Sequence, residues 1–239
     1  MGRGWVHGVR MLAGAQKGKL FTKIAKEIAV AVRTGGSKDP NLNSRLRLAL
    51  REAQKASMTK DTVERALKRG AGESTEGELE EIVFEGYGAS GIPVLIEVLT
   101  DNRQRSVQDI RAILTRASGA LGEPGSVSWN FERVGSIIAH DKKAVDGKSR
   151  DAEEAAINAG ADAVEAMDEG QFQFICAMSD LESVSEALAK QDWEVLKTEL
   201  IYKAKVPSTL SGPEQEAQLQ KLNDNLNDHD DVKRVHFAL

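Results

Sequence analysis

The stretch Ile82–Thr100, IVFEGYGASGIPVLIEVLT, marks the point where the chain changes from helical to mixed α and β character. Two apolar runs within it, Ile82–Tyr87 and Pro93–Thr100, flank a short loop that begins and ends with glycine. Runs of this length around a glycine-bounded loop are typical of a β-hairpin. Asp101-Asn102 follows directly and predicts the cap of a helix that continues to about Ala117. The stretch therefore opens an α+β fold.

Downstream of this helix, the sequence predicts two interleaved α+β units. The element order over 134–205 is strand, helix, strand, strand, helix, strand, which is typical of a ferredoxin-like fold. The predicted strands are Ser126–Glu132, Ser136–His140, Ala163–Met167, Phe172–Met178 and Val195–Lys203, the helices are Ala152–Ala159 and Asp180–Gln191, and a hairpin turn lies at Asp168–Gly170. After Pro207, a helix (Pro213–Asn227) and a strand (Val232–Ala238) are too little to fold alone. We expect them to complete the domain that begins at residue 78.

Upstream, the first 77 residues predict three helices. Apolar residues from Leu20 to Val32 recur at spacings of three and four, which predicts a helix with one buried apolar face. Gly35-Gly36 ends this helix. A second helix carries the apolar positions of Leu46–Ala53. The third begins near Asp61, where Asp61 and Glu64 resemble a capping box, and stops at Gly70.

The predicted fold is thus an α+β multidomain protein: an N-terminal three-helix domain (1–77), followed by two ferredoxin-like α+β domains (78–133 with 206–239, and 134–205). The third domain is inserted into the second.

Charge is divided unequally along the chain. Residues 1–72 hold 16 Lys and Arg against 5 Asp and Glu, a net charge of +11; the whole chain carries −5, so residues 73–239 carry −16. A basic N-terminal region followed by an acidic remainder is typical of a protein that binds a polyanion through its basic region alone. The candidate nucleic-acid-binding residues are Lys17, Lys19, Lys23, Lys26, Arg47, Arg51, Lys55, Lys60, Arg65, Lys68, Arg69, Arg103 and Arg105.

Two groups among these candidates have a specific pattern. Arg47, Arg51 and Lys55 are spaced by four, so they form a basic ridge on one face of the second helix. Arg103 and Arg105 lie between a strand and a helix, and guanidinium groups suit bidentate phosphate binding. The competing interpretation is a solvated helical face, with Asp101 capping the helix and pairing with one arginine.

Several strings in the chain resemble the YebC/PmpR family, in order over residues 15–135. They are Gly18-Lys-Leu-Phe-Thr-Lys23, Arg45-Leu-Arg47, Met58-Thr-Lys-Asp61, Glu64-Arg65-Ala66, Glu85-Gly-Tyr-Gly88, Leu99-Thr-Asp-Asn-Arg103 with Arg105, Leu121-Gly122, Gly125-Ser-Val127 and Phe131-Glu132. The resemblance implies a helical domain and two ferredoxin-like domains. It also implies a regulator of gene expression, since members are described as DNA-binding transcriptional regulators or as translation factors, including the mitochondrial activator of cytochrome c oxidase translation.

The chain departs from the family pattern at two places. The family usually has a Lys/Arg-rich run after an early tryptophan, but here Val6–Gly14 holds only His7 and Arg10 as basic residues. Ser57 and Thr59 stand where Asn and Pro are common, which changes the start of the third helix.

Other classes of function find little support in the sequence. The four histidines are scattered without a ligand spacing, no serine lies in a nucleophile elbow, and Cys176 sits alone in an apolar run, so we expect no catalysis, cofactor or metal. No apolar run approaches the ~20 residues that span a bilayer. No serine precedes Ser37 in the acid-poor N-terminal segment, which is unlike a transit peptide, so we expect a cytoplasmic protein.

We therefore expect a non-enzymatic, cytoplasmic regulator, monomeric, that binds nucleic acid through its helical domain. Its target is either duplex DNA or ribosomal RNA with tRNA on the ribosome. The alternative is a protein-interaction adaptor that acts through the acidic α+β domains.

Overall fold

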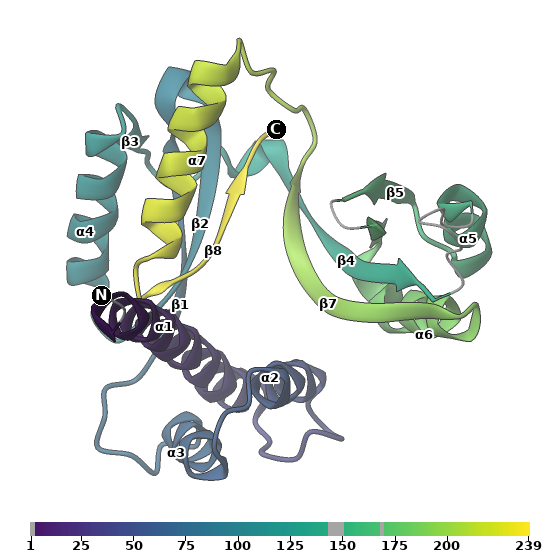
Figure 1. Cartoon of the computed structure of the whole chain (residues 1–239), viewed down its shortest axis with the longest axis horizontal. Helices are drawn as coiled ribbons and strands as arrows, with labels where there is room; N and C mark the ends of the chain where they lie inside the picture. Colours follow the sequence, from purple (N-terminus) through teal and green to yellow (C-terminus); the bar gives the residue numbers. More distant parts are fainter. Residues whose placement is uncertain (1–2, 143–150, 168–169) are drawn as a thin grey trace. The chain divides into compact units, whose positions relative to one another are not determined.

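The computed structural model describes residues 3–142, 151–167 and 170–239, with side chains described from residue 17 onward. The chain forms two compact units, Met1–Trp129 with Pro207–Leu239, and Asn130–Val206 (Figure 1). The second unit thus interrupts the first in sequence. The finer division into three domains, with a boundary after residue 77, stays a prediction.

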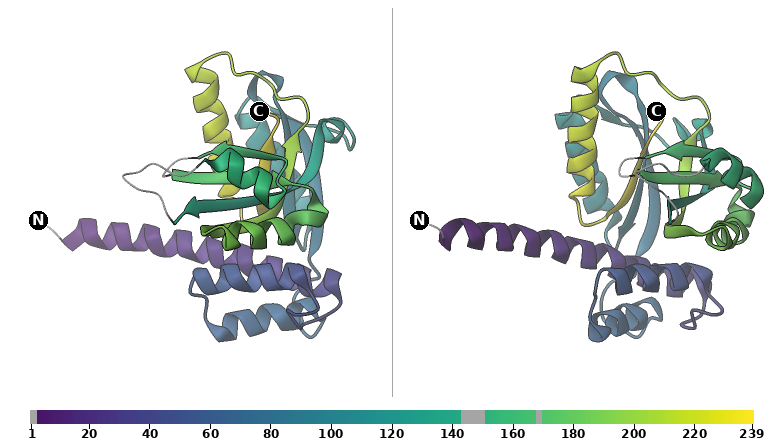
Figure 2. Two further views of the ribbon diagram at one scale, coloured as in Figure 1. Left: turned by 90° about the vertical axis from the view of Figure 1, so that its right-hand side faces the viewer. Right: turned by 45° about the vertical axis from the view of Figure 1, so that its right-hand side comes forward.

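Three helices open the first unit: α1 (Arg3–Gly35), α2 (Ser44–Lys55) and α3 (Lys60–Gly70). The predicted stripe on α1 is buried, with Ile28 and Ala31 fully enclosed by α2 and α3. Helix α1 ends as predicted, with Gly36 at a φ of 63°. It begins far earlier than its apolar stripe, and Figure 2 shows its N-terminal half extending beyond α2 and α3.

Side chains set the starts of α2 and α3. Asn43 caps α2, because its Oδ1 accepts a hydrogen bond from the Leu46 amide at 3.0 Å, while its Nδ2 donates to the Ala31 carbonyl of α1 at 2.8 Å. The cap of α3 is Thr59, whose Oγ1 accepts from the Thr62 amide. The prediction of Asp61 as this cap is wrong, because Asp61 already lies in the first helical turn.

The turn between α2 and α3 has a hydrogen-bond pattern typical of a Schellman motif. The Met58 amide donates to the Ala53 carbonyl and the Ser57 amide to the Gln54 carbonyl. Ser57 has a φ of 58°, in the left-handed region that favours glycine or asparagine. At the two positions that depart from the family pattern, Ser57 therefore occupies a strained turn and Thr59 supplies the helix cap.

The rest of the first unit is a four-stranded antiparallel sheet in the order β3-β1-β2-β8. The chain runs through β1 (Glu80–Tyr87), a short 3₁₀ turn η1 (Ala89–Gly91), β2 (Pro93–Thr100), α4 (Arg103–Arg116), β3 (Ala120–Leu121), α7 (Pro213–Asn227) and β8 (Val232–Phe237). Helices α4 and α7 pack on one face through Ile110, Leu114, Leu222 and Leu226. The C-terminal helix and strand thus complete this sheet domain, as expected.

A second apolar cluster joins α1 to this sheet domain. Ala29 and Val30 of α1 pack against Leu79 and Leu99. The helical region is thereby held on the sheet domain by apolar burial as well as by the charges described below.

The inserted unit is a ferredoxin-like sandwich with an antiparallel sheet in the order β5-β6-β4-β7. Its elements are β4 (Phe131–Asp141), α5 (Ala152–Ala159), β5 (Ala163–Ala166), β6 (Gln171–Cys176), a 3₁₀ turn η4 (Met178–Asp180), α6 (Leu181–Lys190) and β7 (Trp193–Ala204). Trp193, Phe174 and Leu188 centre its core. The α+β class and the order of these elements are confirmed.

Two predicted strands prove to be one. Ser128–Asn130 is a 3₁₀ turn, η2, and β4 then runs without a break through Phe131–Asp141, so the separation of Ser126–Glu132 from Ser136–His140 is wrong. A polar pair, Glu132-Arg133, and Gly135 interrupt the apolar pattern, but β7 pairs with β4 across all of these residues and holds it extended, and β6 joins the pairing from Gly135 onward. Of the predicted hairpin Asp168–Gly170, the first two residues lie outside the described part of the chain.

Candidate nucleic-acid interface

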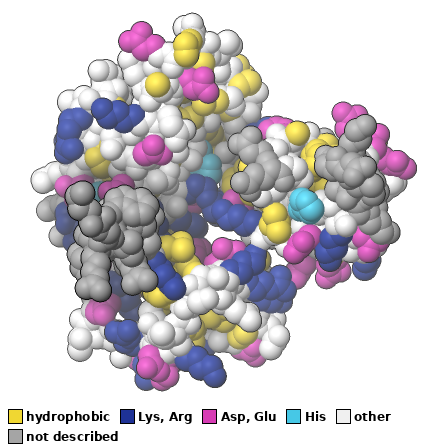
Figure 3. Space-filling model, viewed as in Figure 1, with side chains coloured by type: hydrophobic (Ala, Val, Ile, Leu, Met, Phe, Trp, Pro, Cys, Tyr) yellow, Lys and Arg dark blue, Asp and Glu magenta, His cyan; other side chains and the backbone are white. Residues whose placement is uncertain are grey.

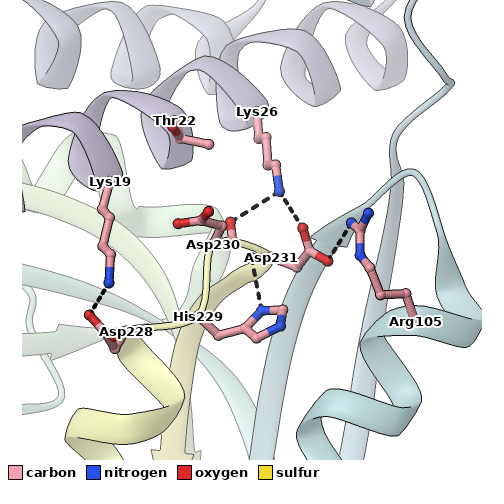
Figure 4. A pocket seen from close by; sticks show the side chains of 8 residues that line it. All are labelled: Lys19, Thr22, Lys26, Arg105, Asp228, His229, Asp230 and Asp231. Atoms are coloured by element: carbon pink, nitrogen blue, oxygen red, sulfur yellow. Dashed lines mark hydrogen bonds and ion pairs between the residues drawn. The ribbon is translucent and has the colours of Figure 1, made fainter. Parts of the chain in front are cut away.

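Three of the candidate lysines form a row along α1 and meet the end of α7. Lys19 and Lys26 face the segment Asp228–Asp231, called here the acidic loop (Figure 4), and Lys23 lies between them in the sequence of α1. Lys19 forms an ion pair with Asp228, and Lys23 donates to the carbonyl of Asn227 at the last turn of α7. The lysine row therefore neutralises the negative end of a helix and the acids that follow it.

Asp231 is the buried member of the acidic loop. Its side chain is 3% exposed and accepts hydrogen bonds from Lys26, Arg105 at 2.9 Å, Ser106 at 2.8 Å and Thr100 at 3.1 Å. Burial by itself would raise the pKa of Asp231, but these hydrogen bonds and the charge of Lys26 outweigh burial and hold the pKa well below its usual value. We call Asp231 with Lys26 and Arg105 the central joint.

Arg103 and Arg105 have different environments although they are two residues apart. Of the two residues predicted for the cap of α4, Asn102 is the cap, because its side chain accepts from the Arg105 amide at 3.1 Å. The competing assignment of the cap to Asp101 is wrong, since the Asp101 carboxylate pairs with arginines instead. The Arg105 guanidinium points toward the Asp231 carboxylate, 2.9 Å away, and also lies 3.3 Å from the Asp101 carboxylate. Arg103 is exposed and forms no hydrogen bond or ion pair with a described residue. Asp101 also binds Arg69 of α3 at 3.1 Å.

A second group of charges joins the helical region to the sheet, and the sequence offered no sign of it. Arg45 of α2 bonds Glu27 of α1 at 2.8 Å and Glu81 of β1 at 2.8 Å. Lys233 of β8 lies 3.1 Å from Glu27 and 3.7 Å from the buried Glu97 of β2. Arg45 belongs to a string that resembles the family, but local sequence pattern does not reveal its role, because its partners are distant in the sequence.

Glu97 continues this network into the sheet. His236 lies 2.6 Å from its carboxylate, and both side chains are buried. Burial would raise the pKa of Glu97, but the hydrogen bond with His236 and the charges of Lys233 and Arg234 outweigh it and lower the pKa to about 2.

The remaining candidates lie on α2 and α3, except for Lys17 on α1. Arg51 of α2 and Lys60 of α3 are exposed and form no hydrogen bond or ion pair within the described chain. Lys55 and Lys68 are exposed but lie beside acids one helical turn away, Glu52 and Glu64. Arg47 is half-buried, Arg65 bonds its own helix, and Lys17 lies 5.5 Å from the Phe21 ring. Figure 3 shows basic and acidic side chains interspersed over this part of the surface.

The structure therefore separates the candidates into two groups. One group is engaged by acids or carbonyls of the sheet domain and its connections: Lys19, Lys23, Lys26, Arg69 and Arg105. The other presents its charge on the outer helical surface or at the start of α4: Lys17, Arg47, Arg51, Lys55, Lys60, Arg65, Lys68 and Arg103. The sequence count of +11 treats the helical region as isolated, whereas in the folded chain distant acids offset part of it.

A cleft of about 430 Å³ lies between the lysine row and the acidic loop (Figure 4). Lys19, Thr22, Lys26 and Arg105 line it together with the four residues of the acidic loop. Within the described residues, no group of three His, Cys, Asp or Glu side chains could hold a metal ion. No helix among them is both long and apolar enough to cross a membrane.

Comparison with known families covers both parts of the chain. Residues 7–73 match the model of the TACO1/YebC protein N-terminal domain, and residues 79–239 match the model of the TACO1/YebC second and third domain. The chain belongs to the TACO1/YebC family. This confirms the resemblance to YebC/PmpR proteins that the sequence strings indicate.

Relatives of this TACO1/YebC chain match it along nearly its full length. A "Probable transcriptional regulatory protein" of Bdellovibrio bacteriovorus is 45% identical, and the alignment covers 100% of this chain and 100% of the relative. One from Chloroflexus aurantiacus is 41% identical over 98% of this chain and 92% of its own. A crystal structure of a conserved hypothetical protein from Aquifex aeolicus has a TM-score of 0.84 at 35% identity, covering 93% of this chain and 90% of its own.

Proposed function

We propose that this protein is a non-enzymatic regulator of gene expression that binds nucleic acid through the outer surface of α2 and α3. The observation that carries the proposal is the pair Arg51 and Lys60, whose exposed charges have no partner among the described residues. Cations of this kind attract phosphates and release condensed counterions on binding. Relatives named as probable transcriptional regulatory proteins support a regulatory role.

Arg103 extends this surface to a second element. It is exposed at the first turn of α4, and its guanidinium can bind a phosphate through two parallel hydrogen bonds. Its neighbour Arg105 is part of the central joint and contributes to holding α4, not to the interface. The proposed interface residues are thus fewer than the thirteen candidates.

The test is charge reversal at two positions. Arg51→Glu/Lys60→Glu is compared with Lys190→Glu/Lys221→Glu, which makes the same change in net charge on α6 and α7. Binding to duplex DNA and to ribosomes is measured at physiological salt. The first variant should lose binding at least tenfold and the control should change little, because the protein's overall charge has the same value in both.

Equal behaviour of the two variants would remove the α2–α3 surface as the contact and would favour the adaptor alternative, which acts through the acidic domains. If the first variant alone loses binding, co-sedimentation of the wild-type protein with ribosomes in the presence of excess duplex DNA distinguishes the ribosome from duplex DNA as the target. Retention on ribosomes identifies a translation factor; loss to the DNA identifies a transcriptional regulator in a cytoplasmic setting.

A further inference from the structure

The contact between the lysine row and the acidic loop has two halves of different strength. In the buried half, Lys26 is 12% exposed and Asp231 3%, and Asp231 is surrounded by hydrogen-bond donors. In the outer half, Lys19 is 40% exposed and Asp228 is 70% exposed. Exposed ion pairs are weak and are screened by salt, whereas a buried pair cannot lose one member without leaving a charge unpaired.

The acids of the outer half are also poorly placed for the stability of their own helix. Asp228 is the C-terminal cap residue of α7, Asp230 follows it, and the last turn of the helix contains no basic residue. Negative charge at a helix C-terminus is repelled by the helix dipole. Asp228 is stabilised from outside the helix by its ion pair with Lys19 of α1, and Lys23 donates to the Asn227 carbonyl beside it.

A nucleic-acid backbone offers these lysines the same chemistry. The last residue of α7 and the acidic loop present carbonyl and carboxylate oxygens to successive turns of α1, and a phosphate backbone presents a comparable row of anionic oxygens. Lys19 and Lys23 can exchange one set of acceptors for the other, while Lys26 stays bound to Asp231 and keeps α1 in place.

We propose that the acidic loop is an internal competitor for nucleic acid: Asp228 occupies Lys19, the Asn227 carbonyl beside the loop occupies Lys23, and binding of phosphates to this lysine pair requires these contacts to break. This inference rests on the proposed function and concerns its regulation. It makes the α1 row a second phosphate-binding surface that the folded protein holds closed.

The experiment neutralises the outer acids and leaves the central joint intact. Asp228→Asn/Asp230→Asn is compared with Glu214→Gln/Glu216→Gln, the same charge change at the first turn of the same helix. Affinity is measured against a 24-base-pair duplex DNA and against an RNA hairpin, each over a series of salt concentrations. The loop variant should bind at least about fivefold more tightly than the control at low salt, and its log–log salt slope should steepen by roughly 0.7–0.9 for each added phosphate contact.

A further substitution distinguishes local competition for Lys19 from a general change in the protein's electrostatic field when two negative charges are removed. Lys19→Gln is made in the wild-type and in the loop-variant background. Local competition predicts that Lys19→Gln removes much of the gain in the loop variant but has little effect on the wild type, whose Lys19 is already occupied.

Three outcomes are distinct. A gain confined to the loop variant and dependent on Lys19 supports the competitor. Equal affinities and slopes for the loop variant and the control overturn it while leaving the proposed function standing. Absence of binding by every variant on both probes, even at low salt, overturns the proposed function itself. The nucleic acid that shows the larger gain identifies the source of the phosphates.

Discussion

The central joint makes a quantitative prediction about Asp231. Replacing Asp231 with Asn keeps the size of the side chain and retains an oxygen that Thr100 and Ser106 can donate to. It leaves the largely buried Lys26 without its anion and removes one of the two carboxylates beside Arg105. Removal of one partner from a buried ion pair costs about 3–5 kcal/mol.

The matched control lies three residues away. Asp228→Asn removes the same charge from the same loop, but the Asp228 side chain is 70% exposed, so we expect a loss of at most about 1 kcal/mol. The comparison cancels any effect of net charge. It leaves burial and the number of donors as the difference between the two positions.

The assay is chemical unfolding followed by circular dichroism, combined with hydrogen exchange measured on peptides. In Asp231→Asn, amides of α1 and α4 should exchange faster, because the joint connects these helices to the acidic loop. Amides in the core of the inserted unit, around Trp193, should keep their protection. A loss of stability no larger than that of Asp228→Asn would refute the reasoning.

Three further predictions concern other sites. The pKa of Glu97 is about 2 in the folded chain, below its unfolded value of about 4.3. Its contribution to the free energy of unfolding should therefore be present above pH ~4.3 and be lost as the pH falls toward 2. Glu97→Gln should flatten this part of an acid-unfolding curve. Ser57→Gly should stabilise the chain by about 0.5–1 kcal/mol in thermal unfolding, because glycine adopts a φ of 58° without strain, and Ser57→Ala should give no such gain. Glu85→Gln should speed amide exchange at Gly125, Val127 and Ser128, whose N–H groups all donate to its carboxylate at 2.7–2.8 Å; unchanged exchange there would show that the carboxylate does not order this loop.

Short-range patterns account for what the sequence predicted well. The apolar stripe of α1, the glycines that end it and the Asn102 cap depend on residues within a few positions of each other, so periodicity and capping chemistry identify them. The two errors have different causes. Thr59 and Asp61 both suit a helix start, and a local contact decides between them, because the Thr59 Oγ1 accepts from the Thr62 amide. Strand β4 stays continuous because β7, distant in the sequence, pairs with it from Phe131 to Asp141.

By itself the sequence determined the family, the α+β class, the order of elements in the inserted unit and the uneven distribution of charge. Only the tertiary structure decided which of the basic residues face outward. Lys26 and Asp231 are 205 positions apart, yet the docking of α1 against the end of α7 brings them into a buried ion pair. The physical reason is that the free energy of a charge depends on its burial and on the partner opposite it, and the fold sets both.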